Sequence, residues 1–333
     1  MLKILVMHPD DYTRATFFTA DVKQQLNELG EVVWNDGAEK FTEDKLVGII
    51  GDVDVVIGGW DMPVFTPRIL DAAKKLKYIG HAAGSVKHYI INEDVFDRGI
   101  TVSNAAMGIA KYVAEGALAL ILAALKDLYG INYTMKVDKA DPSGAMYTDS
   151  LYNKKVGLIG FGMVGRAMPP LLAPFDTEIS VYDPYLSADA AKACGVIKKE
   201  LNDLLADSDI ISLHAPNTPE TKNMLNLNNL CMIKPGALLV NTARAAIVDE
   251  LALLGELKKD RFKAALDVFW KEPLPKDHEL RRMPGVLITP HNVAYAARQR
   301  AEQVEIVIND IKLFLDGKKP IYNIDKHIYR IMA

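Results

Sequence analysis

Short apolar runs alternate with amphipathic stretches along the first hundred residues. Five runs have the length and composition of buried strands, at residues 3–7, 31–34, 54–57, 77–80 and 100–103. Between them, apolar positions recur at helical spacing over residues 12–29, 42–50 and 66–76. Because strands that alternate with helices form βαβ units, this pattern predicts an α/β domain with a mostly parallel sheet.

The same alternation returns after residue 154 and predicts a second α/β domain. Its expected strands begin at Lys155 and continue at residues 179–182, 210–213, 237–241, 264–268 and 286–289. A helix is expected over residues 296–315, with Gly317 as its C-cap.

Residues 108–154 connect the two patterns. Residues 108–129 are helical in pattern and, after Glu115, apolar on nearly every face, which predicts a helix covered on all sides by domains or subunits. Residues 131–154 are polar and irregular, with a turn cluster that begins at Asp141. We expect a loop there.

Length and composition limit the protein's class. The chain has 333 residues, of which 50% are hydrophobic, and a formal net charge of −4. At about 150 residues per domain, this length predicts two domains with cores of their own. The composition excludes an intrinsically disordered chain, and the near-neutral charge lacks the basic surface that nucleic-acid binding requires. We expect no nucleic-acid partner.

The apolar stretches and the cysteines indicate where in the cell the protein is expected. The longest strongly apolar stretch, residues 116–125, is well short of the roughly 20 residues that a membrane-spanning helix needs. The N-terminal apolar run is too short for a signal sequence. Cys194 and Cys231 suggest neither a disulfide framework nor a closely spaced metal-binding pair. We expect a cytoplasmic protein without a membrane segment or a metal site.

A glycine motif opens the second domain. Gly160, Gly162 and Gly165 follow an apolar strand and precede a helical stretch, the arrangement in which a backbone turn approaches a dinucleotide pyrophosphate. Asp183 ends the next strand, where a carboxylate can accept both ribose hydroxyls and favours NAD over NADP. Pro169 and Pro170 follow closely, so we expect this helix to be short or bent.

Three later strands each end in a residue that could take part in catalysis. Arg244 follows one, Asp267 and Glu272 follow the next, and His291 follows the last. Ligands of open α/β sheets bind outside the carboxyl ends of the strands. Alone, each of these residues is more often a surface or turn residue. Together they match a carboxylate anchor, an orienting acid and an acid/base catalyst.

These stretches make the sequence recognisable. It resembles the D-isomer-specific 2-hydroxyacid dehydrogenases, the family of phosphoglycerate dehydrogenase, glyoxylate/hydroxypyruvate reductase and D-lactate dehydrogenase. The resemblance spans essentially the whole chain, and its motifs lie at residues 156–165, 213–221, 234–244, 248–250, 265–273 and 289–291.

The resemblance implies a role for each candidate residue. Arg244 would anchor the substrate, His291 would donate and accept the proton, and Glu272 would be its partner. The implied NAD contacts are Gly160, Gly162, Met163, Val164, Gly165, Asp183, His214, Thr242, Ala243, Arg244, Asp267 and His291. Ala83, Gly84 and Ser85, with Arg244 and His291, would bind the substrate, although Val86 and Lys87 stand where the family usually has Asp-Asn.

The resemblance also implies an architecture of two doubly wound parallel-sheet domains. An NAD-binding Rossmann domain (107–296) would be inserted in the sequence between the two segments of a discontinuous, flavodoxin-like substrate domain (1–106 and 297–333). A homodimer would form through the apolar helix and residues 131–152. The implied activity is NAD-dependent interconversion of a small 2-keto acid and a 2-hydroxy acid.

Two other classes remain open. One is a non-catalytic NAD(H)-binding regulatory protein on the same fold, which the complete set of Arg244, Glu272 and His291 disfavours. The other is a methyltransferase, because adenosyl-methionine sites also use a glycine turn followed by an acid. A methyltransferase gives no reason for these three residues to occur together.

Overall fold

The computed structural model describes residues 1–91, 93–140 and 148–332. The chain divides into two compact units, Met1–Ile109 with Tyr295–Ala333, and Ala110–Ala294. The first unit is therefore built from both ends of the chain. Its boundary at residue 109 lies inside helix α6 (Ala106–Leu125), which runs on into the second unit without a break. No sequence signal marks that point, and the expected boundary at residue 106 differs by three residues.

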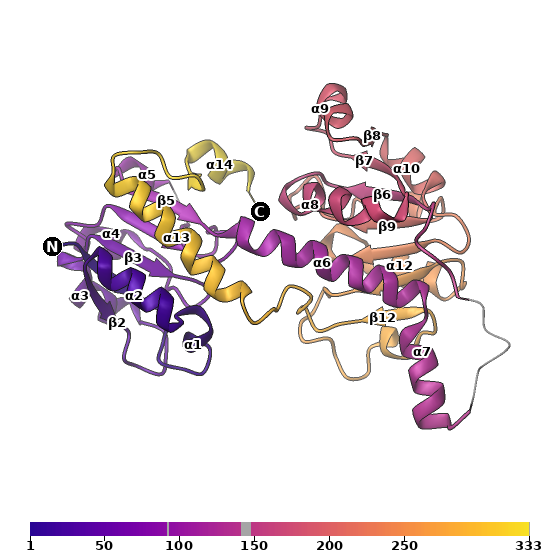
Figure 1. The fold of residues 1–333 in the computed structure, drawn as a ribbon, viewed down its shortest axis with the longest axis horizontal. Helices are drawn as coiled ribbons and strands as arrows, with labels where there is room; N and C mark the ends of the chain where they lie inside the picture. The colour runs from indigo at the N-terminus through magenta and orange to yellow at the C-terminus, as the bar shows by residue number, and fades with distance from the viewer. Residues whose placement is uncertain (92, 141–147, 333) are drawn as a thin grey trace. The chain divides into compact units, whose positions relative to one another are not determined.

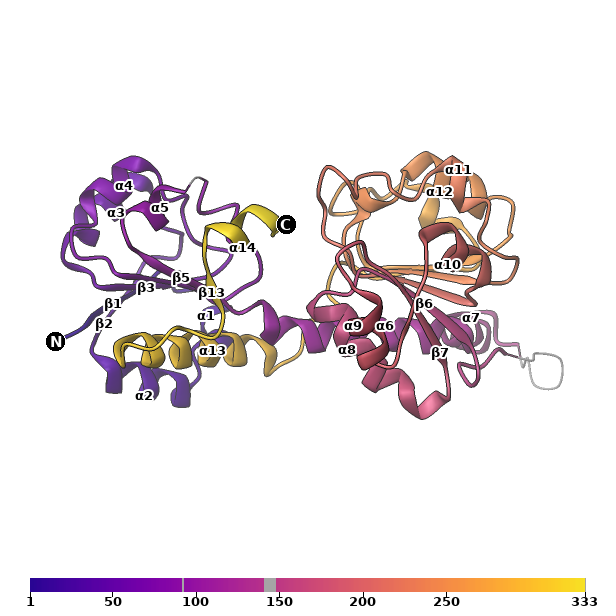
Figure 2. The same ribbon diagram turned by 90° about the horizontal axis from the view of Figure 1, so that it is seen from above.

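The first unit contains a six-stranded sheet in the order β13-β5-β4-β3-β1-β2. Five strands run parallel, and β13 pairs antiparallel with β5. Helices cover both faces, with α2 and α13 on one and α3 and α4 on the other (Figure 2). The strands are β1 (Lys3–Val6), β2 (Glu31–Trp34), β3 (Val55–Gly58), β4 (Tyr78–His81), β5 (Thr101–Asn104) and β13 (Asn323–Ile324). The helices are α1 (Arg14–Phe17), α2 (Ala20–Leu29), α3 (Glu43–Ile49), α4 (Pro67–Ala72), α5 (Asp94–Asp97), α13 (Gln299–Leu315) and α14 (Lys326–Ile331).

The second unit contains a parallel seven-stranded sheet in the order β12-β11-β10-β9-β6-β7-β8. The order reverses between β6 and β9, as in doubly wound dinucleotide-binding folds. Its strands are β6 (Lys155–Ile159), β7 (Glu178–Tyr182), β8 (Ile197–Lys198), β9 (Ile210–Leu213), β10 (Leu238–Asn241), β11 (Lys263–Leu266) and β12 (Val286–Ile288). Its helices include α7 (Leu128–Tyr133), α8 (Met163–Leu172), α9 (Ala188–Ala193), α10 (Leu201–Asp207), α11 (Leu227–Leu230) and α12 (Glu250–Leu257), most of them labelled in Figure 1.

Helix α13 shows how the C-terminal segment joins the first sheet. Its apolar residues, including Val304 and Val307, are fully buried in the core with Ile4 and Ile57. The helix approaches β4 so closely that a Cβ on Gly80 would lie 2.3 Å from Val307. Gly317, at a φ of +71°, ends it as expected.

Helix α6 is long and apolar enough to cross a membrane by length and composition alone. The longest apolar stretch seen in the sequence is shorter because it begins after Glu115. In the structure, Ala114, Ala117 and Ile121 are fully buried in the core beside Val156 of β6. These contacts place one face of α6 in the core, and 44% of its most apolar window is buried.

Local structure departs from the expected elements most clearly at one helix and one loop. The helix expected over residues 12–29 is interrupted at Thr19, whose hydroxyl accepts the Val22 N–H and starts α2. The expected loop is wrong for residues 131–138, which continue as α7 and a π-helical turn. Residues 141–147, with the expected turn at Asp141, lie outside the described residues. Helix α8 runs for ten residues with both prolines inside it.

Candidate active site

The turn between β6 and α8 requires two of its three glycines. Gly160 has a φ of +92°, and a Cβ there would lie 2.5 Å from the backbone nitrogen of Ala215. A Cβ on Gly165 would lie 2.3 Å from the carbonyl oxygen of Gly160. Gly162 faces open space, with nothing within 4 Å of an added Cβ. The backbone at Gly162 is therefore open to a close approach by a ligand.

The first turn of α8 offers backbone donors. Among the described residues, the N–H groups of Met163, Val164 and Gly165 have no hydrogen-bond partner, and Gly162 contributes no capping side chain. The positive end of the helix dipole lies at the same place. These groups suit the pyrophosphate of a dinucleotide.

Asp183 follows β7 and is tied to the glycine turn. Its Oδ2 accepts the Phe161 N–H at 2.7 Å, and its Oδ1 accepts the Tyr185 N–H at 2.8 Å. Each carboxylate oxygen has a second lone pair, which can accept a ribose hydroxyl. Asp183 therefore both holds the turn and presents an acceptor beside it.

Two buried polar atoms lie beyond the ends of the neighbouring strands. His214 follows β9, and its Nε2 has no partner among the described residues. Burial lowers the pKa of His214 to about 4, so the ring is neutral near pH 7. Thr242 follows β10, and its Oγ1 is likewise buried and unpartnered. An unpaired buried polar group costs about 1–3 kcal/mol, so both atoms fit a site in which a bound cofactor supplies the partner.

Arg244 stands on a turn that Asn241 holds. The Asn241 side chain accepts the Ala243 N–H at 3.0 Å and donates to the Arg244 carbonyl at 3.1 Å. The Arg244 guanidinium donates to the Ala243 carbonyl at 2.8 Å and forms no ion pair within the described residues. Asn241 is not among the site residues predicted from the sequence. Its only signal is a polar residue that ends a buried strand.

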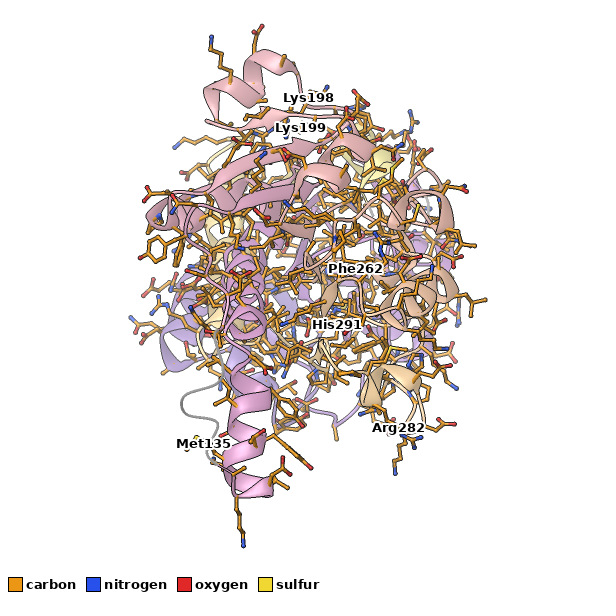
Figure 3. All side chains as sticks on the ribbon, turned by 90° about the vertical axis from the view of Figure 1, so that its right-hand side faces the viewer. Met135, Lys198, Lys199, Phe262, Arg282 and His291 are labelled. Atoms are coloured by element: carbon orange, nitrogen blue, oxygen red, sulfur yellow. The ribbon has the colours of Figure 1, made fainter. Side chains whose placement is uncertain are left out.

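His291 and Glu272 meet through their side chains. His291 lies just after β12 at a φ of +55°, and its Nδ1 lies 2.7 Å from Glu272 Oε2 (Figure 3 labels His291). The other carboxylate oxygen of Glu272 accepts the Phe269 N–H at 3.0 Å. When Glu272 is ionised it can only accept, so Nδ1 carries the hydrogen. Nε2 is then the ring atom left to exchange a proton.

Asp267, at the end of β11, holds the histidine loop on both sides of His291. Its Oδ1 accepts the Thr289 hydroxyl at 2.6 Å and the Asn292 N–H at 3.0 Å. Its Oδ2 accepts the Val293 N–H at the longer distance of 3.4 Å. Asp267 is 1% exposed. The structure thus gives Asp267 a loop-anchoring role, in addition to the NAD contact that the family resemblance implies.

The remaining expected residues, Ala83, Gly84 and Ser85, follow β4 in the first unit. The Gly84 carbonyl accepts the Asn104 side chain at 2.7 Å, which fixes this turn. The N–H groups of Ala83 and Gly84 have no partner in the described part of the chain. The structure therefore places Arg244, Glu272 and His291 after three adjacent strands of one sheet, and residues 83–85 in the other unit.

Within residues 1–91, 93–140 and 148–332, no group of three or more His, Cys, Asp or Glu side chains is placed to hold a metal ion.

Comparison with known proteins identifies the family of the chain. Residues 118–293 match the family model for the D-isomer-specific 2-hydroxyacid dehydrogenase NAD-binding domain. D-3-phosphoglycerate dehydrogenase of Methanocaldococcus jannaschii is 33% identical over 96% of this chain and 58% of its own length. Glyoxylate reductase of Korarchaeum cryptofilum is 28% identical over 90% of each chain. The chain thus spans about half the length of the D-3-phosphoglycerate dehydrogenases that it matches, from 48% to 58%.

Solved structures show the same fold. A phosphoglycerate oxidoreductase from Rhizobium etli superposes with a TM-score of 0.82 at 24% identity, over 98% of both chains.

The family model covers more than half of this chain, including the glycine turn, Arg244, Glu272 and His291. The chain therefore belongs to the D-isomer-specific 2-hydroxyacid dehydrogenase family, and its second unit carries that family's NAD-binding domain.

Proposed function

We propose that this protein is an NAD-dependent D-2-hydroxyacid dehydrogenase that interconverts a small 2-oxo acid and the corresponding D-2-hydroxy acid. The observation that carries the proposal is the 2.7 Å contact between His291 and Glu272. This pair follows the strands next to that of Arg244, in a sheet whose glycine turn suits a dinucleotide. Bound NAD(H) would supply or accept the hydride at the substrate's second carbon.

Arg244 is assigned to the anionic and carbonyl oxygens of the substrate. Negative charge grows on the carbonyl oxygen as the 2-oxo acid is reduced, and a fixed guanidinium stabilises that charge. Its planar fork can hold two oxygens at once. The guanidinium has no acidic partner within the described residues, so binding substrate breaks no existing ion pair.

His291 is assigned to proton transfer. Its Nε2 donates a proton to the carbonyl oxygen during reduction and takes it back during oxidation. Glu272 orients the ring through Nδ1 and stabilises the charged imidazolium, the usual role of a carboxylate behind a catalytic histidine. We assign the N–H groups of Ala83, Gly84 and Ser85 to the substrate carboxylate.

The test is NADH oxidation with a panel of short 2-oxo acids, followed by NAD reduction with the D and L forms of the product. We expect turnover with at least one 2-oxo acid and only the D form in the reverse direction. Tight NADH binding without turnover of any member would instead favour the non-catalytic NAD(H)-binding regulatory protein.

We further propose a cytoplasmic homodimer. Support for the dimer comes from α7 and the π-helical turn, which leave Leu128, Tyr129, Met135 and Val137 more than half exposed. This segment points away from the rest of the second unit, with Met135 on its projecting part (Figures 1 and 3). The exposed free thiols Cys194 and Cys231 suit a reducing compartment. Light scattering should give twice the chain mass and, for Met135→Asp, a shift toward the monomer.

A further inference from the structure

Arg166 brings a positive charge to the glycine turn of the second unit. It is in the first turn and a half of α8, where long side chains point back toward the start of their helix. Its guanidinium carbon lies 4.9 Å from the centre of the Phe161 ring. Phe161 is the residue between Gly160 and Gly162, and its side chain is buried. The guanidinium therefore covers a fixed part of the turn.

The same phenylalanine connects Arg166 with Asp183. The Phe161 N–H donates to Asp183 Oδ2 at 2.7 Å, while the guanidinium lies over the Phe161 ring. Arg166 Nη1 also lies 3.7 Å from the Sγ of Cys194, at the end of α9, the helix that follows Asp183. Arg166 thus contacts both the glycine turn and the segment after β7. These two segments border the adenosine ribose in a dinucleotide site.

The positive charge of Arg166 is not neutralised by an acidic side chain. Within the described residues Arg166 forms no ion pair, and its side chain is exposed. The Cys194 thiol that it contacts is only a weak acceptor. Asp183, in contrast, accepts the N–H groups of Phe161 and Tyr185, which partly offset its negative charge. The surroundings of the ribose therefore carry a guanidinium as well as a carboxylate.

This combination bears on the choice between NAD and NADP. NADP carries an additional phosphate on the 2′-oxygen of the adenosine ribose, and a phosphate monoester has a charge of about −1.5 to −2 near pH 7. The carboxylate of Asp183 repels that charge. A guanidinium attracts it and can hold two phosphate oxygens through paired hydrogen bonds. Moving the Arg166 guanidinium from Cys194 to a phosphate would break no ion pair of the described residues.

We propose that Arg166 binds the 2′-phosphate of NADP, so that the second unit accepts NADP as a second cofactor beside NAD. Arg166 and Asp183 then act in opposite directions on cofactor choice. Asp183 favours the free 2′-hydroxyl of NAD, and Arg166 offsets part of the repulsion that Asp183 exerts on the 2′-phosphate. This inference rests on the NAD-binding part of the proposed function and requires nothing of its substrate or its chemistry.

The first test compares AMP with adenosine 2′,5′-bisphosphate, which differ only in the 2′-phosphate. Calorimetry on the whole chain gives the Kd of each. Arg166→Met keeps an apolar side chain over the Phe161 ring but removes the charge. It should weaken bisphosphate binding about tenfold, the size of a lost hydrogen bond to a charged group, and AMP binding less than about twofold. Lys192→Met removes an equal charge from an exposed position on α9 and should leave the ratio of the two Kd values unchanged.

The second test uses the whole cofactors. Fluorescence titration measures the Kd of NADPH and of NADH for Asp183→Ala, alone and combined with Arg166→Met. Without the repelling carboxylate, NADPH binding should depend on Arg166, so the combined variant should bind NADPH about tenfold more weakly than Asp183→Ala does. Arg166→Lys, which keeps a point charge without the fork, should lose less bisphosphate affinity than Arg166→Met.

The outcomes separate this inference from the proposed activity. A loss of bisphosphate affinity confined to the Arg166 variants supports the inference, even if no 2-oxo acid is turned over and the proposed activity fails. The inference is overturned by a wild type that does not bind the bisphosphate, by an unchanged ratio in Arg166→Met, or by an equal loss in Lys192→Met. Thermal melting confirms that the variants fold.

Discussion

Acid should destabilise the second unit through His214. The folded protein holds the pKa of this buried histidine at about 4, against 6.5 for an ordinary histidine. The unfolded chain therefore binds one more proton between these values, so stability falls as the pH falls through this window. Going from pH 7 to pH 5 should remove about 2 kcal/mol, and the loss should level off below about pH 4.

The assay is urea unfolding of the cofactor-free protein at pH 7 and pH 5. A separate unfolding curve with NADH identifies the transition of the second unit, because bound NADH shifts that transition to a higher urea concentration. His214→Leu replaces the ring with an apolar side chain that cannot be protonated, so about 2 kcal/mol of the pH dependence should disappear. His88→Leu, at an exposed position in the first unit, is the control and should keep the wild-type difference. Equal pH dependence in His214→Leu and the wild type would refute the reasoning.

Three further substitutions test the cofactor and substrate contacts. Gly165→Ala should weaken NADH binding at least tenfold in a fluorescence titration, because the new Cβ meets the Gly160 carbonyl at 2.3 Å; unchanged affinity would show that the turn can adjust. Asp183→Ala should narrow the preference for NAD over NADP and also weaken the binding of NADH, since the Phe161 N–H loses its acceptor. An unchanged ratio of kcat/KM for NAD to kcat/KM for NADP would place the ribose contact elsewhere. Arg244→Lys should raise the KM for 2-oxo acids about tenfold or more, because a point charge cannot replace the fork; an unaltered KM would exclude Arg244 as the anchor.

Strands buried on both faces were the easiest elements to predict. The run at residues 210–213 is buried throughout and apolar at every position except Ser212, and it matches β9 at both ends. β8 and β13 escaped prediction because each has two residues, too few to show a period. The helix at residues 131–138 escaped because its side chains are exposed and leave no one-sided apolar stripe.

The candidate catalytic residues could be predicted from the order of the parallel strands. The residues that hold them in position could not. Arg244, Glu272 and His291 each come after a largely apolar strand, and parallel strands end at one edge. The anchoring role of Asp267 depends on the path of a loop more than 20 residues away in sequence.

Proton transfer by His291 is the central claim, and the most direct measurement is the turnover of His291→Asn beside its affinity for NADH. We expect kcat to fall by about 10²–10⁴-fold, while the Kd for NADH stays within about twofold. His327→Asn, at an exposed position in α14, should match the wild type in both quantities. Wild-type turnover in His291→Asn, with NADH affinity intact, would contradict the account.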